Sequence, residues 1–179
     1  MTTQELAQKL AGYFKDVAIE CVEGVKHPIT GVKVGDDFLV IPAGKLTEIC
    51  QKLAEIDQFS FDCLSNLTAV DRLKDPSPRF DVVYNLFSYK NRHSLTLKVY
   101  LPRDVSDAGV HVETVEKIWG VANWLEREVY DLFGIIFDGH SDLRRIMLPD
   151  DWEGHPLRKD YQQKDEYRGT ATTRPSMLQ

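Results

Sequence analysis

The feature that most constrains the fold is a pair of alternating apolar segments joined by a short polar stretch. In the first segment, Phe80, Val82, Tyr84 and Leu86 occupy every second position. Residues 95–101 repeat the pattern, with leucine or valine alternating with threonine, lysine and tyrosine. Between them, residues 90–93 read Lys-Asn-Arg-His. A period of two with a short polar loop predicts an antiparallel hairpin with one buried face, ended by Pro102.

Apolar spacing elsewhere predicts helices and short strands around this hairpin. Helical spacing covers residues 4–14, 43–56 and 115–133, where Gly120 is a point of division and Gly134 a natural end. Segments rich in β-formers predict strands over 17–25, 37–41 and 64–70, the first two separated by turn residues around Pro28 and Gly31. The order α-β-β-α-β-β-β-α predicts an α+β fold, with helices packed on a mixed or antiparallel sheet, and argues against a doubly wound parallel sheet.

The character of the chain changes near residue 137. Residues 138–179 hold many charges, several glycines, and prolines including Pro149, Pro156 and Pro175. A stretch this long without a core of its own is unusual inside a compact domain. We therefore expect a globular domain over 1–137 and an extended tail over 138–179. Scattered apolar residues favour a tail that is ordered on a partner protein over a disordered one: Ile146, Met147, Leu148, Trp152, Leu157 and Tyr161.

Composition excludes several classes of function. The 179 residues carry 22 Lys plus Arg against 28 Asp plus Glu, a net charge of −6. This balance argues against sequence-independent binding of nucleic acid and against a polybasic membrane-surface helix. No apolar run approaches the roughly 20 residues of a membrane span. The first ten residues resemble neither a signal peptide nor a transit peptide, so we expect a soluble, unprocessed chain.

The cysteines limit the redox chemistry of the chain. Cys21, Cys50 and Cys63 are far apart and form no C-x-x-C pair. An iron–sulfur cluster commonly takes four closely spaced thiolates, so an all-cysteine cluster is excluded. An odd number of cysteines favours reduced thiols that fill the core.

The densest group of charges lies on the last predicted helix. On a helical wheel, Glu126 falls near the centre of the apolar face, whereas Arg127, Glu128 and Asp131 point elsewhere. A buried carboxylate must be paired or neutralised. We expect Glu126 to form a buried ion pair with a downstream arginine, Arg144 or Arg145, and Arg127 to pair with Asp131 on the helix surface.

Catalytic readings have less support. Metal-ligand types occur along the segment: Glu126, Glu128, Asp131, His140, Asp142 and His155. However, no H-E-x-x-H framework organises them, and His140 and His155 lie in loops where structural hydrogen bonding is common. The G-x-S-x-G, P-loop and G-x-G-x-x-G motifs are absent. Trp119 and Trp124 suit a core or an interface, and Trp152 suits an interface.

These residues resemble the signature of a known family. The run Glu126 to Ile135, followed by Phe137, Gly139-His140 and Asp142 to Ile146, looks like the C subunit of NADH-quinone oxidoreductase, the 30-kDa subunit of respiratory complex I. Residues 151–161 resemble the second motif of the family, and residues 67–71 and 79–84 also fit. The resemblance covers about residues 64–161. Many relatives have proline after the final tyrosine, whereas Gln162 follows here.

The resemblance implies a non-catalytic scaffold in the hydrophilic arm, beside the D and B subunits. Iron–sulfur clusters, FMN, NADH and quinone would reside in partner subunits of this proton-translocating translocase. The chain would be peripheral, at the cytoplasmic face of the bacterial inner membrane or on the matrix side in mitochondria. The residues of the first motif would form a structural hub: Glu126, Arg127, Glu128, Asp131, His140, Asp142, Arg144 and Arg145. Those of the second would form the tail interface: Trp152, His155, Pro156, Arg158, Lys159, Asp160 and Tyr161.

Three alternatives stay open at this point. The chain could be the equivalent subunit of a related membrane-bound hydrogenase complex. It could be an independent soluble metalloenzyme that uses the His, Asp and Glu cluster. It could also be an adaptor unrelated to electron transfer.

Overall fold

A five-stranded mixed sheet forms the centre of the molecule. The computed structural model describes residues 1–26, 33–103 and 109–172. The strand order is β1-β4-β7-β6-β5, where β6 (Arg79–Ser88) and β7 (His93–Pro102) are the predicted antiparallel hairpin. β5 (Cys63–Asp71) pairs antiparallel with β6, and β4 (Phe38–Ile41) pairs parallel with β7. The predicted α+β class with a mixed sheet is therefore confirmed.

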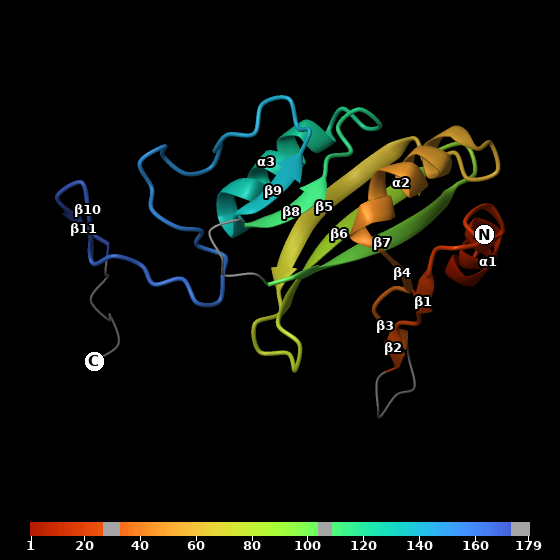
Figure 1. The fold of residues 1–179 in the computed structure, drawn as a ribbon, viewed down its shortest axis with the longest axis horizontal. Coiled ribbons are helices and arrows are strands. Elements are labelled where there is room, and N and C mark those ends of the chain that lie inside the picture. The colour runs from red at the N-terminus through yellow and green to blue at the C-terminus, as the bar shows by residue number, and fades with distance from the viewer. Residues whose placement is uncertain (27–32, 104–108, 173–179) are drawn as a thin grey trace.

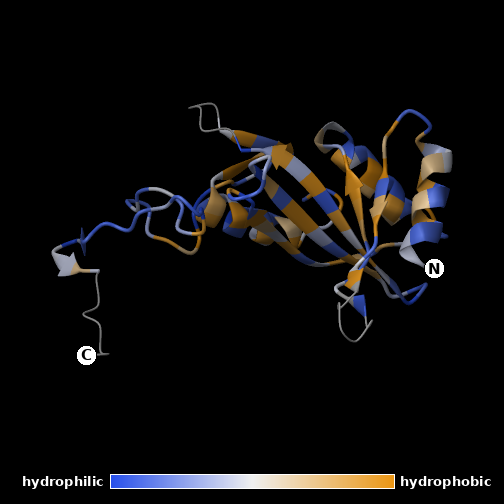
Figure 2. Ribbon diagram, turned by 90° about the horizontal axis from the view of Figure 1, so that it is seen from below, coloured by the Kyte–Doolittle hydropathy of each residue, from blue (hydrophilic) through white to orange (hydrophobic). Residues whose placement is uncertain are grey.

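The alternation that predicted the hairpin corresponds to one buried face. Phe80, Val82, Tyr84 and Leu86 are all buried, as are their counterparts on β7, whereas Thr96, Lys98 and Tyr100, on the other side of β7, are only partly buried. Figure 2 shows the same alternation of apolar and polar residues along the strands. Burial of one side of a strand is what a period of two requires.

The first predicted strand, 17–25, is divided in the structure. β1 (Glu20–Val22) pairs with β4, whereas β2 (Val25–Lys26) pairs with β3 (Lys33–Val34) in a separate two-stranded ribbon. Gly24 lies at the division, and its backbone N–H donates to Asp37 Oδ1 instead of to a sheet partner. The turn predicted around Pro28 and Gly31 lies outside the described residues.

Three α-helices within the described ranges flank the sheet. α1 (Thr3–Tyr13) begins with a capping box between Thr2 and Glu5. A short 3-10 turn, η1 (Ala43–Lys45), leads into α2 (Leu46–Glu55), whose apolar face is buried. α3 (Ala122–Phe133) ends at Gly134 with φ 72°, as predicted for a glycine after a helix. These helices agree closely with their predicted ranges, except at the start of α3.

The helix predicted over 115–133 is too long, because the residues before Ala122 form turns, and an unpredicted strand precedes those turns. β8 (Val110–Glu113) pairs parallel with β9 (Ile135–Asp138), the strand that follows α3. Val115 and Trp119 are four residues apart and both buried, as in a helix, but they lie in a turn. The Trp119 indole N–H donates to the carbonyl of Phe61. Figure 1 shows α3, β8 and β9 as one unit packed beside the sheet.

The chain beyond β9 runs along α3 and then leaves the body. Its distal part carries a small ribbon, β10 (Glu166–Tyr167) paired with β11 (Thr170–Ala171). In Figure 1 this ribbon lies far from the sheet. None of the helices in the described ranges is long and apolar enough to cross a membrane.

Candidate functional site

Asp131 fixes the segment after β9 to α3. Its carboxylate is buried, and Arg145 Nη1 donates to Oδ1 at 2.7 Å. Three consecutive backbone N–H groups, from residues 146, 147 and 148, donate to Oδ2 at 3.1, 2.7 and 2.9 Å. Burial opposes ionisation of this carboxyl, but the backbone donors and Arg145 outweigh it and hold the pKa below its ordinary value. Asp131 is therefore an anion that binds the loop of residues 145–148.

The same segment satisfies the carbonyl groups at the end of α3. The Leu157 N–H donates to the carbonyl of Leu132 at 3.0 Å. Arg158 donates from Nε to Phe133 O at 2.5 Å and from Nη2 to Gly134 O at 3.3 Å, while His155 Nδ1 donates to Asp131 O at 2.8 Å. Helix C-termini leave such carbonyls unpaired and favour a cation. The tail thus acts as the C-terminal cap of α3.

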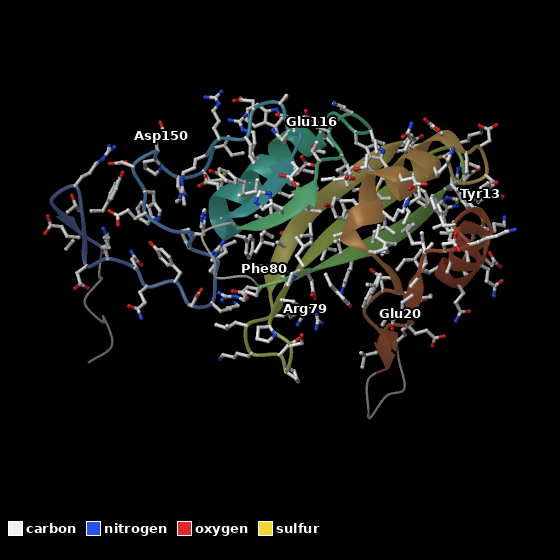
Figure 3. The ribbon with its side chains drawn as sticks, in the orientation of Figure 1. Tyr13, Glu20, Arg79, Phe80, Glu116 and Asp150 are labelled. Atoms are coloured by element: carbon white, nitrogen blue, oxygen red, sulfur yellow. The ribbon has the colours of Figure 1, made fainter. Side chains whose placement is uncertain are left out.

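A second buried carboxylate, Asp71 at the end of β5, holds the tail farther along. Arg103 Nε and Nη2 donate to its two oxygens at 3.1 and 3.2 Å, and the Lys159 N–H donates to Oδ2 at 2.8 Å. Arg103 Nη2 also lies 2.5 Å from Asp160 Oδ1. The guanidinium groups of Arg103 and Arg158 both lie over the ring of Phe80, which Figure 3 labels. Residues 158–160 are therefore attached to the sheet.

Glu126 is buried as the helical wheel indicates, but the predicted ion pair with an arginine is wrong. Thr114 Oγ1 donates to its Oε2 at 2.5 Å and the Val115 N–H to its Oε1 at 2.8 Å. Arg145 is bound to Asp131 instead, and Arg144 to Asp142 at 2.9 Å. Burial raises the pKa of Glu126 to about 7. Hydrogen bonds, not a cation, satisfy this carboxyl.

The predicted surface pair of Arg127 with Asp131 is also wrong. Both side chains are buried, because the segment after β9 covers that side of α3. Arg127 Nε donates to the carbonyl of Arg144 at 3.3 Å, its Nη1 lies 3.8 Å from Asp142, and its guanidinium lies over Trp124. Arg144 is mostly exposed, and Glu128 is exposed.

His140 joins the loop after β9 to the beginning of α3. Its Nε2 donates to the carbonyl of Asn123 at 3.0 Å, and the Asp142 N–H donates to Nδ1 at 3.0 Å. The Glu116 carboxylate accepts three hydrogen bonds. Asn123 Nδ2 donates at 2.9 Å, the Ser141 backbone N–H at 2.9 Å and Ser141 Oγ at 3.1 Å. These bonds fasten the loop to the turn before α3.

The remaining tail residues are less enclosed. Trp152 is half-buried, with its ring centroid 4.9 Å from that of Tyr167, and Pro156 and Tyr161 are also half-buried. Trp152 and Tyr161 line a hollow of about 240 Å³. Met147 and Leu157 expose apolar side chains. In the described ranges, no group of three or more His, Cys, Asp or Glu side chains is arranged to hold a metal ion.

Four residues that form these attachments were not predicted from the sequence. Arg103, Thr114 and Glu116 have no helical or strand period that would single them out. Asp71 offered a signal: it falls at a position that the alternation of its strand assigns to the core. An acid at such a position needs a partner, which the fold supplies in Arg103.

Comparison with known proteins places the chain in a family. The family described as "Respiratory-chain NADH dehydrogenase, 30 Kd subunit" matches residues 39–167. The C subunit of NADH-quinone oxidoreductase from Geobacter metallireducens is 46% identical over 127 residues, covering 71% of this chain and 75% of that protein. The corresponding C subunit from Geobacter sulfurreducens is 48% identical over 127 residues, with the same coverage of 71% and 75%.

Solved structures agree. A trypsin-resistant fragment (1-134) of Nqo5 is 32% identical, with a TM-score of 0.56, over 79% of this chain and 100% of that one. A chain of the membrane-bound sulfane sulfur reductase, an archaeal respiratory membrane complex, has a TM-score of 0.67 at 24% identity, over 89% of this chain and 85% of that one, and shares the fold. The matched residues and the curated relatives together show that this chain belongs to the 30-kDa subunit family of respiratory-chain NADH dehydrogenase, the C-subunit family of NADH-quinone oxidoreductase.

Proposed function

We propose that the chain is a structural subunit in the hydrophilic arm of a proton-translocating NADH-quinone oxidoreductase, where it contacts the D and B subunits. In this proposal it carries no catalytic residue and binds no cofactor. Iron–sulfur clusters, FMN, NADH and quinone belong to partner subunits, through which electrons pass from NADH to quinone. Through the complex, the chain is peripheral to the cytoplasmic face of the bacterial inner membrane.

The observation that carries this proposal is that the tail is attached to the body and also exposes apolar side chains to solvent. Asp131 and Asp71 attach it to the body at residues 145–148 and 159–160. Within this stretch, the side chain of Met147 at the first attachment is 62% exposed, and that of Leu157 between the two attachments is 46% exposed. A segment that is fixed by buried carboxylates yet presents apolar side chains to solvent suits a surface that another protein covers. We accordingly assign residues 1–137 to the body and 138–179 to the partner-binding tail.

The curated relatives favour NADH-quinone oxidoreductase over the hydrogenase-related alternative. Their names state that enzyme at 46–48% identity, whereas the sulfane sulfur reductase chain, at 24% identity, supports a common fold only. We assign the tail contact to the D subunit, with Trp152, Pro156, Lys159 and Tyr161 beside Met147 and Leu157.

Two exposed side chains of similar exposure allow a matched test. Met147→Lys alters the tail, and Tyr89→Lys alters the far hairpin, where Tyr89 is 69% exposed. Surface changes of this kind usually alter stability by less than about 0.5 kcal/mol. After purification through a tag on this chain, we expect Met147→Lys to lose the D subunit and NADH-quinone reductase activity, and Tyr89→Lys to keep both. Equal recovery of the D subunit with both variants would reject the tail contact.

The absence of catalysis by the chain itself needs a separate assay. The full chain, purified alone, is expected to oxidise no NADH with a quinone acceptor and to contain no stoichiometric iron or zinc. Stoichiometric metal together with an activity of its own would instead support the metalloenzyme alternative.

A further inference from the structure

One cluster of ionisable side chains lies outside the proposed contact with the D subunit. Glu126 on α3, Glu116 in the turn before α3 and His140 after β9 meet around His140 Nε2, which lies 3.9 Å from Glu126 Oε2 and 3.7 Å from Glu116 Oε2. The side chains of Glu126 and His140 are 0% exposed and that of Glu116 is 10% exposed. Figure 3 labels Glu116 near the start of α3.

No lysine or arginine within the described ranges pairs with either carboxyl group. Glu116 is satisfied by three donors from Asn123 and Ser141. Among the residues that the structure describes, Glu126 receives two donors, from Thr114 and Val115. On the core side of Glu126 lie the Cys50 thiol of α2 and the Tyr84 hydroxyl of β6; burial raises the pKa of both, so they stay neutral. His140 is thus the one group in the cluster that could supply a positive charge.

The hydrogen bonds of His140 in this conformation are those of a neutral ring. Because Nδ1 accepts from the Asp142 N–H, it carries no hydrogen of its own. The hydrogen therefore resides on Nε2, which donates to the carbonyl of Asn123. An imidazolium would place a second N–H against the N–H of Asp142 and break that bond. The loop in this conformation holds a neutral histidine.

Glu126 consequently faces the negative charge of Glu116 across a neutral ring, inside the core. We propose that Glu126 is a proton-binding site of the folded protein, and that release of its proton loosens the attachment of residues 139–142 to α3. The proton comes from solvent onto a carboxylate oxygen and returns to it, with no other bond made or broken. An isolated buried carboxylate is costly, so the neutral acid is favoured.

The electrostatics of the cluster support this assignment. Burial first, and then the charge of Glu116, raise the pKa of Glu126 to about 7, against an ordinary value of 4.5. The difference amounts to roughly a few-hundredfold tighter proton binding. The hydrogen bonds that Glu116 accepts from Asn123 and Ser141 outweigh burial and hold the pKa of Glu116 below its ordinary value, so Glu116 stays an anion. Of the two carboxyl groups, Glu126 is then the one that exchanges a proton near neutral pH.

The test is a titration of the full chain. We expect the infrared band of a protonated carboxyl to be strong at pH 6, much weaker at pH 8, and absent at both in Glu126→Gln. The backbone amide resonances of Ser141 and Asp142 should shift with a midpoint near pH 7 in the wild type and not in Glu126→Gln. Glu128→Gln, an exposed change on the same helix, is the matched control and should titrate like the wild type.

A second variant keeps the inference testable if Glu126→Gln does not fold. Glu116→Gln removes the neighbouring charge, so the amide midpoint should move to lower pH. The inference is overturned if the wild type shows no protonated-carboxyl band at pH 6, or if Glu116→Gln leaves the midpoint unchanged. Because these measurements use the chain alone, their failure would leave the proposed contact with the D subunit untouched.

Discussion

Asp131 and Arg145 form a 2.7 Å ion pair that joins the last helix to the segment beyond β9. The same carboxylate accepts three backbone N–H groups, so one side chain organises a whole loop. Charge-assisted bonds of this kind are short and strong, and leaving one partner of a buried pair alone is costly. This relationship is one of the physical links between the body and the tail.

Asp131→Asn should therefore destabilise the chain strongly. Removing the charge leaves Arg145 without its partner and weakens the three backbone bonds, and we expect a loss of about 3 kcal/mol in the free energy of unfolding. Asp151→Asn removes one side of the exposed pair with Arg168 in the same tail and should destabilise the chain far less than Asp131→Asn, because solvent screens that pair. Urea denaturation at pH 7 measures both, and equal losses would contradict the assigned role of Asp131.

The acid sensitivity of the chain should depend on the same residue. The pKa of Asp131 is depressed in the folded protein, so its contribution to stability is complete above the ordinary value of 3.8 and is lost as the pH falls below it. Between pH 5 and pH 3 the unfolding free energy of the wild type should fall more steeply than that of Asp131→Asn. Parallel curves for the two proteins would show that Asp131 is not held as an anion.

Gly134 should tolerate no side chain. It has φ 72°, and a Cβ atom there would lie 2.5 Å from Arg158 Nη2 and from the His155 ring. Gly134→Ala combines backbone strain with displacement of the residues that cap α3, so we expect a loss of at least about 2 kcal/mol. Gly120→Ala is the matched control, because a Cβ at Gly120 has no neighbour within 4 Å. Thermal unfolding compares them; a stable Gly134→Ala would contradict the packing of the tail on α3.

Arg103→Lys should weaken the second attachment. A lysine cannot reproduce the two parallel bonds to Asp71 while also reaching Asp160. We expect a loss of about 2 kcal/mol and faster proteolysis near residues 158–161. Arg144→Lys, at an arginine that is 70% exposed, should change neither measurement. If both variants behave alike, the Asp71 cluster does not hold the tail.

Local patterns predicted the parts of the fold that depend on neighbours in sequence. The hairpin of β6 and β7 and the end of α3 at Gly134 follow from alternation and from the conformational freedom of glycine. The pairing of β8 with β9 escaped prediction, because it joins strands separated by a whole helix. Parallel pairing of this kind leaves no local signal.

The same limit explains the errors at the site. A helical wheel considers only the apolar side of α3 that packs on the core. Glu126 lies on that side, so its burial was predicted correctly. It also predicted an exposed Asp131, because a wheel cannot include the second layer that residues 144–148 place over the opposite side. The choice of partner for each arginine depends on that layer as well. Arg145 consequently binds Asp131, and Glu126 relies on Thr114 and Val115.

Cross-linking mass spectrometry of the assembled complex tests the central claim most directly. Lys164, a mostly exposed residue of the tail, and Lys159 provide reactive amines close to the apolar residues of the proposed interface. We predict links from these two lysines to the D subunit, and none to it from Lys9 in α1, at the opposite end of the molecule in Figure 1. Links to the D subunit from Lys9 alone, with the tail lysines unlinked to any other subunit, would contradict the account.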